Sequence, residues 1–189
     1  MRFNILMLTL LLIPALQACA PVVAGGAVAG GVVVATDRRT SGTYVEDQGI
    51  DLKAANRISD KFGDKVHVNV NTFNRNVLVT GEAPSEEDKQ EVERIVRGIP
   101  NVRGVVNEVA VAGATSLTSR SNDTFITSKV KARFLEANKF QTVHVKVVTE
   151  NGVVYLLGMV SRQEAADATD LASTTSGVKK VVKLFEYLD

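Results

Sequence analysis

A run of alternating valines occurs twice in this chain at a fixed spacing. Val66–Val70 (VHVNV) matches Val143–Val147 (VHVKV) at an offset of 77 residues, and the next apolar run, from Val77 and from Val154, keeps the same offset. After a one-residue deletion the match resumes at an offset of 76 near the end of each copy. Self-similarity at a fixed period indicates repeated structural units. The sequence therefore predicts two small domains of the same fold.

Each copy has the pattern helix, strand, strand, helix, strand. Ala55, Ile58 and Phe62 form a helical stripe, and a second stripe recurs in a helix expected from about Thr124 to Asn138. The alternating valines predict a strand with one buried face. The last strands are expected at about 102–111 and 178–187. The predicted fold class is α+β, with two tandem αββαβ domains that each pack a three-stranded mixed sheet against two helices.

Local signals mark the turns and helix starts. Asn151-Gly152 predicts a type I′ hairpin, and Asn74-Arg75-Asn76 is its counterpart in the first copy. Ser161-x-x-Glu164 predicts a capping box, and Ser85 stands at the corresponding helix start. Asp123 or Asn122 is expected to be the N-cap of the first helix in the second copy.

The N-terminal segment resembles a bacterial lipoprotein signal. Arg2 precedes a short apolar stretch, and Leu16-Gln17-Ala18 stands directly before Cys19, the single cysteine. The resemblance implies that Cys19 carries a diacylglycerol and an acyl chain such as palmitate. Ala20, rather than Asp, follows it, which favours the outer membrane. The alternative is an ordinary cleaved signal with an incidental cysteine.

The predicted organisation is a signal peptide at 1–18, a lipidated Cys19 with an Ala/Gly/Val-rich tether at 19–43, a first domain at 44–113, a linker at 114–120 and a second domain at 121–189. The tether could instead be a membrane-buried helix or an oligomerisation element. Lys and Arg (22) nearly balance Asp and Glu (21), so no nucleic-acid partner is expected.

Further residues resemble the BON domain family. The αββαβ order, the glycine that ends the second strand, and Gly177-Val178-Lys179-Lys180-Val181 at the last strand carry the likeness. Ser121–Lys131 is similar to the segment before the second domain in dual-BON lipoproteins of Gram-negative outer membranes. The resemblance implies a non-enzymatic, periplasm-facing lipoprotein that binds anionic phospholipid (phosphatidylglycerol, cardiolipin) through its second domain and supports envelope integrity.

The first helix of the second copy has an apolar arc beyond its core stripe, with basic residues beside it, a pattern typical of helices on anionic membranes. The predicted phospholipid-binding residues are Phe125, Ser128, Lys129, Lys131, Ala132, Arg133 and Leu135. Charge favours this copy, since 44–113 carries net −3 and 114–189 net +2. The first copy's helix has no aromatic residue on its outward side and is the control; its residues expected outward are Lys53, Asn56, Arg57, Asp60 and Lys61.

Two alternatives stay open. Phe125 and Leu135 could instead pack against the first domain or the linker, and Glu136 weakens a uniformly basic surface. The chain could also be a protein-interaction adaptor that docks on outer-membrane assembly proteins or the cell wall. His67 and His144 occupy matching strand positions and are expected to be solvated or to pack. No catalytic motif, metal site or cofactor is predicted.

Overall fold

The computed structural model describes residues 37–113 and 117–189, and both copies of the repeat lie within these ranges. The signal peptide, Cys19 and the tether up to residue 36 lie outside the described residues. No helix in the described ranges has the length and apolar character needed to cross a bilayer.

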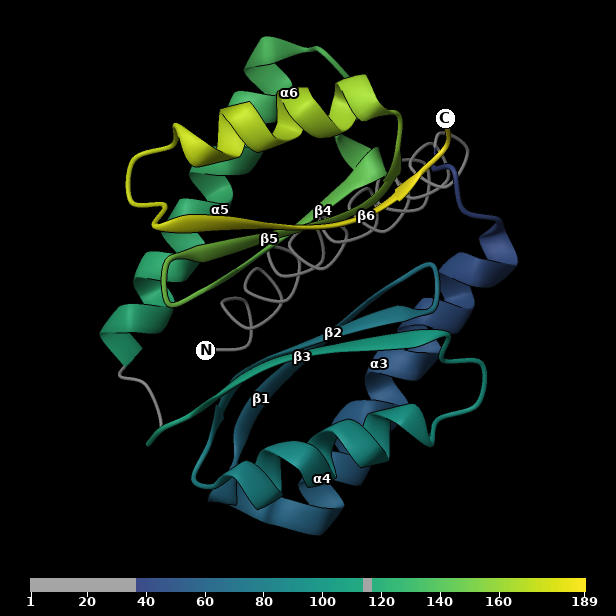
Figure 1. The fold of residues 1–189 in the computed structure, drawn as a ribbon, viewed down its shortest axis with the longest axis vertical. Coiled ribbons are helices and arrows are strands. Elements are labelled where there is room, and N and C mark those ends of the chain that lie inside the picture. The colour runs from purple at the N-terminus through teal and green to yellow at the C-terminus, as the bar shows by residue number, and fades with distance from the viewer. Residues whose placement is uncertain (1–36, 114–116) are drawn as a thin grey trace, which may run out of the picture. The chain divides into compact units, whose positions relative to one another are not determined.

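The first copy has the predicted element order. It contains α3 (Ser41–Phe62), η1 (Gly63–Lys65), β1 (His67–Phe73), β2 (Asn76–Ala83), α4 (Glu86–Arg97) and β3 (Gly104–Val111). The second copy repeats it as α5 (Leu117–Ala137), η2 (Thr142–His144), β4 (Val145–Glu150), β5 (Val153–Val160), α6 (Arg162–Ser173) and β6 (Lys180–Tyr187). Figure 1 shows each sheet with its two helices on one face.

Each sheet is mixed, as expected. β2 lies between β1, to which it is antiparallel, and β3, to which it is parallel. β5 takes the same place between β4 and β6. The antiparallel pair needs only a tight turn, whereas the parallel pair needs a crossover, which α4 and α6 supply. The fold class predicted from the repeat is confirmed.

Both hairpins turn through residues with positive φ. Asn151 (φ 51°) and Gly152 (φ 80°) close the β4–β5 hairpin, and Asn74 (φ 49°) and Arg75 (φ 64°) close β1–β2. Two consecutive positive φ angles are what a type I′ turn requires. The hairpin predictions are therefore confirmed.

Each copy encloses its own core between one face of its sheet and its two helices. The first core is formed by residues of α3, β2 and α4: Ile50, Ala54, Ile58, Val77, Val79, Val92 and Val96. The second core is formed by the matching elements α5, β5 and α6: Ile126, Val130, Phe134, Val154, Leu156, Ala165, Ala168 and Ala172. Both cores lie in the compact unit Arg38–Asp189, which therefore carries what it needs to fold without the upstream residues.

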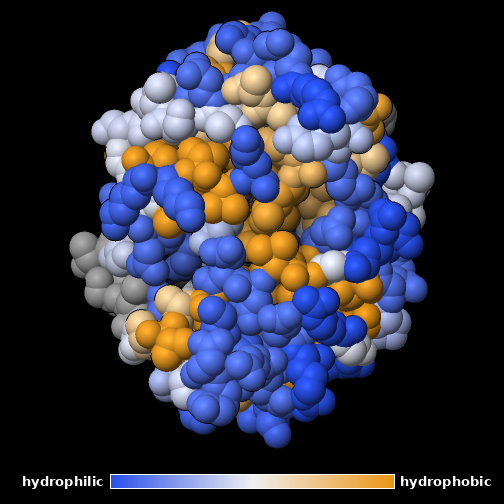
Figure 2. Space-filling model, viewed as in Figure 1, coloured by the Kyte–Doolittle hydropathy of each residue, from blue (hydrophilic) through white to orange (hydrophobic). Residues whose placement is uncertain are grey.

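The other faces of the two sheets pack against each other. Phe73 and Leu78 of the first sheet form one buried cluster with Tyr155 and Leu157 of the second. Alternate residues of β2 and β5 thus serve different cores, because successive side chains of a strand point to opposite faces. Figure 2 shows apolar surface gathered across the middle of one face, between hydrophilic surfaces above and below.

Polar bonds surround this cluster. Asn69 Nδ2 donates to Glu150 Oε2 (3.1 Å), and the amides of Asn74 and Asn76 both donate to Glu186. A further bond has its donor in the second domain and its acceptor in the first: Asn151 Nδ2 donates to Glu82 Oε1 (3.2 Å). The two domains therefore meet through an apolar centre with hydrogen bonds at its edge.

Two helices begin earlier than the sequence analysis predicts. α3 starts at Ser41, inside the expected tether, with the Thr40 side chain accepting from Thr43 N (3.1 Å). α5 starts at Leu117, inside the expected linker, so the prediction of an N-cap at Asp123 or Asn122 is wrong. The first turns of both helices lack an apolar stripe, and periodicity alone could not detect them.

Candidate membrane-contact site

The candidate site lies on α5, which has two apolar arcs, one buried and one exposed. Ile126, Val130 and Phe134 are buried in the second domain's core. Phe125 and Leu135 are 61% and 66% exposed. Neither residue is covered by the first domain, so the alternative that they pack against it is wrong. Part of the linker (114–116), the other surface that they could pack against, lies outside the described residues.

The exposed arc brings together most of the predicted residues. Ser128, Ala132 and Lys131 are exposed beside Phe125 and Leu135, and we call these five residues the α5 surface. Its middle is uncharged, and Lys131 stands at one margin. Glu136 is also exposed, directly after Leu135 and on the same arc of the helix as Phe125 but about three turns away from it, so the surface has an acidic neighbour as the sequence indicated.

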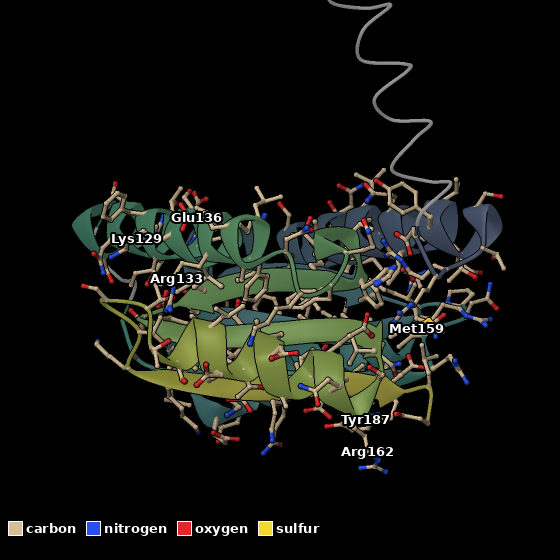
Figure 3. All side chains as sticks on the ribbon, turned by 90° about the horizontal axis from the view of Figure 1, so that it is seen from above. Lys129, Arg133, Glu136, Met159, Arg162 and Tyr187 are labelled. Carbon is tan, nitrogen blue, oxygen red and sulfur yellow. The ribbon has the colours of Figure 1, made fainter. Side chains whose placement is uncertain are left out.

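Lys129 lies at the opposite margin and is held in place. Its ammonium lies 4.7 Å from the centre of the Phe125 ring, within the range of a cation–π contact. It also donates to the backbone oxygen of Ser176, in the loop after α6. Lys129 therefore places its ammonium beside the exposed aromatic ring. It lies just past the middle of α5, the helix that Figure 3 shows with Lys129, Arg133 and Glu136 labelled.

Arg133 is engaged inside the domain. Its Nη1 atom donates to Leu171 O (2.7 Å), Thr174 Oγ1 (2.8 Å) and Thr175 Oγ1 (3.1 Å). These bonds close the carboxyl end of α6 on α5, where backbone carbonyls lack helical partners. Of the predicted basic residues, Arg133 has the clearest structural role.

A buried aspartate fixes the position of α5. Asp123, 6% exposed, accepts hydrogen bonds from Asn151 N and Gly152 N, both at 2.8 Å. In the first copy, Asp47 accepts in the same way from Asn74 N and Arg75 N. Each first helix is thereby fastened to its hairpin, which sets how the helix presents its exposed side.

A groove of about 510 Å³ runs beside α5. Its wall combines β1 of the first domain with α5 and β4 of the second. It is lined by His67, Asn69, Arg120, Asp123, Thr124, Thr127, Ser128, Lys131, Thr149 and Glu150. Basic and acidic groups balance in it, and sequence patterns could not indicate it because its walls come from distant segments.

The two histidines differ in surroundings. His67 begins β1 and lines the groove, whereas His144 is buried, with Nδ1 3.5 Å from Glu164 Oε1. In the described ranges no three His, Cys, Asp or Glu side chains are grouped so as to hold a metal ion.

Arg38, the first residue of the compact unit, is fastened to α6. Its guanidinium donates to Glu164 at 2.6 and 2.9 Å and to Met159 O at 2.8 Å. Burial raises the pKa of Glu164, but the hydrogen bonds from Arg38 and from Ser161 N outweigh it and bring the pKa to about 2. The sequence analysis missed this contact, because only the fold brings Arg38 and Glu164 together.

The αββαβ fold occurs twice in this chain, and in each copy the first helix is bonded to its hairpin through a buried aspartate. This architecture places the chain among proteins with tandem αββαβ domains. Residues 50–113 and 122–189 match the BON domain, and the chain belongs to the BON domain family. It is 39% identical over 177 residues to the outer membrane lipoprotein DolP of Haemophilus influenzae, covering 92% of this chain and 91% of that protein.

Two further relatives have other descriptions. The chain is 30% identical to the 21 kDa hemolysin of Actinobacillus pleuropneumoniae, over 80% of this chain and 79% of that protein. It is 31% identical to the osmotically-inducible protein Y of Escherichia coli, over 74% of this chain and 72% of that protein.

Proposed function

We propose that this chain is a non-enzymatic outer-membrane lipoprotein that faces the periplasm, binds anionic phospholipid through the α5 surface and maintains envelope integrity. The relative described as outer membrane lipoprotein DolP supports the location and the anchor. Cys19 is the proposed lipid attachment site. Phosphatidylglycerol and cardiolipin are the proposed ligands.

One observation carries the lipid-binding part of the proposal. Phe125 and Leu135 are exposed on a helix whose core stripe is already satisfied, and Lys129 and Lys131 stand on either side of them. Inserting Phe125 into a membrane interface can contribute about 2–3 kcal/mol, and each nearby cation about 1 kcal/mol. These contributions are modest alone, but a lipid anchor would raise the local concentration of the site.

Flotation with vesicles tests this function on residues 37–189, which contain the complete compact unit and no cysteine. Binding should increase when phosphatidylglycerol or cardiolipin is added to phosphatidylcholine, and should weaken as salt screens the lysines. Phe125→Glu should lower binding about tenfold or more, because it removes an apolar insertion and adds a repelled charge.

Ala166→Glu is the matched control, since Ala166 is exposed on α6 and the change adds the same charge outside the α5 surface. It should bind nearly as the unchanged protein does. Absence of binding to every vesicle would refute the lipid function and favour a protein-interaction adaptor.

A further inference from the structure

The solvent side of α3 carries two exposed aliphatic side chains, Val45 and Leu52, among uncharged neighbours, with Lys53 and Asp60 exposed at one margin. Ala54, rather than Ala55 as the sequence analysis expected, packs in the core with Ile58. The residues at helical spacing on the solvent side are all exposed: Val45, Gln48, Leu52, Ala55, Asn56 and Ser59. We call these six residues the α3 strip. Val45 is 69% exposed and Leu52 63% exposed, values as high as those of Phe125 and Leu135 on α5.

Several charged residues of α3 are engaged away from the strip, whereas Lys53 and Asp60 are exposed at its margin. Asp47 and Asp51 accept hydrogen bonds from the backbone of the β1–β2 hairpin and of Thr72. Arg57 donates to Gly98 O (3.1 Å) at the end of α4. A surface helix normally places charged residues on the side opposite its core. The α3 strip departs from this rule in the same way as the α5 surface.

Both helices lie at the same edge of the two stacked sheets, although they cover opposite outer faces, because α3 packs on the edge strand β1 and α5 on the edge strand β4. Lys146 of β4 donates to Thr72 O of β1 (3.3 Å) and lies 3.8 Å from Asp51 of α3. Burial lowers the pKa of Lys146, and Lys131 of α5 is among the charges that act on it. Figure 3 shows α3 and α5 along one side of the sheets and α6 towards the other. A flat surface that meets α5 from this side can therefore also meet α3.

The order of the elements along the chain indicates that a membrane contacts the α3 strip. α3 is the first helix of the compact unit, and the segment that leads to it contains Cys19, the proposed lipid attachment site. Val45 lies in the first turns of the helix, close to where the anchored segment enters. A membrane that holds Cys19 is therefore joined to the start of α3 by a stretch of 22 residues (from Cys19 to Ser41) and stays within its reach.

We propose that the α3 strip is a second membrane-contact element, which inserts Val45 and Leu52 into the phospholipid interface alongside the α5 surface. This inference rests on the proposed function and adds the first domain to the membrane-contacting surface. Two weak contacts on one rigid unit reinforce each other, because binding through the first makes the second intramolecular.

The size of the strip favours a bilayer over a second copy of the chain. A stable protein interface buries about 1,200–2,000 Å². Two large apolar side chains on one helix are a small part of such an area. A lipid interface imposes no such requirement, since each inserted side chain contributes by the apolar area it buries.

Vesicle partitioning of residues 37–189 tests the inference, with phosphatidylcholine vesicles that contain phosphatidylglycerol. Leu52→Glu and Val45→Glu should each lower the partition coefficient about tenfold. Gln90→Glu is the matched control, since Gln90 is exposed on α4 and the change adds the same charge there. The control should partition as the unchanged protein does.

A fluorescent label gives a second measurement. Because Cys19 is the single cysteine of the chain, Leu52→Cys in residues 37–189 provides one site for an environment-sensitive dye. Its emission should shift to the blue when vesicles are added, and a dye at Ala166→Cys on α6 should not respond.

The results separate this inference from the proposed function. If Phe125→Glu abolishes binding while both α3 variants bind normally and the dye at position 52 does not shift, the α3 inference fails and the α5 function stands. If Phe125→Glu also binds normally, both fail. A change in sedimentation coefficient on Leu52→Glu without vesicles would assign the strip to a second copy and overturn the inference.

Discussion

Two aspartates perform the same task in the two domains. Asp47 and Asp123 are 1% and 6% exposed, and each accepts hydrogen bonds from two consecutive backbone N–H groups of a hairpin. A buried carboxylate is tolerated only when such donors replace its water. Arg39 adds a charged partner to Asp47 at 2.8 Å. The hairpin N–H groups are therefore fixed by side chains from the preceding helix.

Removing this carboxylate should destabilise the second domain. Asp123→Ala leaves two hairpin N–H groups without their acceptors, and we expect the free energy of unfolding to fall by about 2–4 kcal/mol. Asp123→Asn keeps one acceptor oxygen and should cost less. Urea unfolding of residues 37–189 followed by circular dichroism measures both.

Glu136→Ala is the comparison on the same helix, because Glu136 is exposed and its loss should change stability by less than about 0.5 kcal/mol. If Asp123→Ala were as stable as Glu136→Ala, the hairpin bonds would have no energetic role.

At the scale of elements, α6 begins with a complete capping box. Ser161 Oγ accepts from Glu164 N (3.2 Å), and Glu164 Oε2 accepts from Ser161 N (2.8 Å). Arg38 binds the same carboxylate, so the entry of the chain and the start of α6 are joined. Glu164 thus serves as a helix cap and as the partner of Arg38.

The Glu164 carboxylate should make the free energy of unfolding depend on pH in the acidic range. The pKa of Glu164 is about 2, below the ordinary 4.5, so the folded protein binds its proton less readily than the unfolded chain does. The stabilisation is complete above about pH 4.5 and is lost as the pH falls towards 2. Glu164→Gln should lower the free energy of unfolding by about 1–2 kcal/mol at neutral pH and flatten its slope between these pH values.

Urea unfolding at several pH values measures that slope, with Glu136→Gln as the control for loss of a charge. An unchanged slope in Glu164→Gln would mean that the carboxylate is not held by Arg38 and Ser161 in solution.

Sequence reasoning succeeded where structure is local and failed where it is not. The hairpin at Asn151-Gly152 and the cap at Ser161 follow from neighbouring residues and were predicted correctly. The first turns of α3 contain Gly42 and no apolar stripe, and the helix includes Asp47, whose hairpin bonds come from a distant segment. Such tertiary contacts are absent from any short window of sequence.

The candidate site shows the same division. Helical spacing placed Phe125 and Leu135 outside the core stripe, and the structure has both exposed. Spacing could not show that Arg133 bonds the end of α6, because that contact depends on a helix from a distant segment.

At the scale of the whole unit, the sheets meet through residues that neither domain's own core uses. β5 is apolar on both faces, whereas on β2 the face towards the other sheet carries Leu78 between Asn76, Thr80 and Glu82. The unbroken apolar run from Val153 to Leu157 was a sequence signal for the second buried face, since a strand with one solvated face would alternate. Burial, together with the nearby Glu108 carboxylate, raises the pKa of Tyr155 to about 12. Tyr155 is itself only 4% exposed.

Because Leu157 belongs to the inter-sheet cluster and not to either domain core, a charge there should separate the domains without unfolding them. We expect unchanged residues 37–189 to unfold in one cooperative transition, since unfolding of either domain exposes the apolar face of the other. Leu157→Arg should split this into two transitions in calorimetry, because an unpaired charge cannot stay in that cluster. The free energy of unfolding of the less stable domain should fall by about 3–5 kcal/mol. Leu157→Met keeps volume and polarity and should retain one transition at nearly the same temperature. One transition in Leu157→Arg at the unchanged temperature would mean that the sheets do not stabilise each other, and the α3 strip and α5 surface would then have no rigid frame in which to act together.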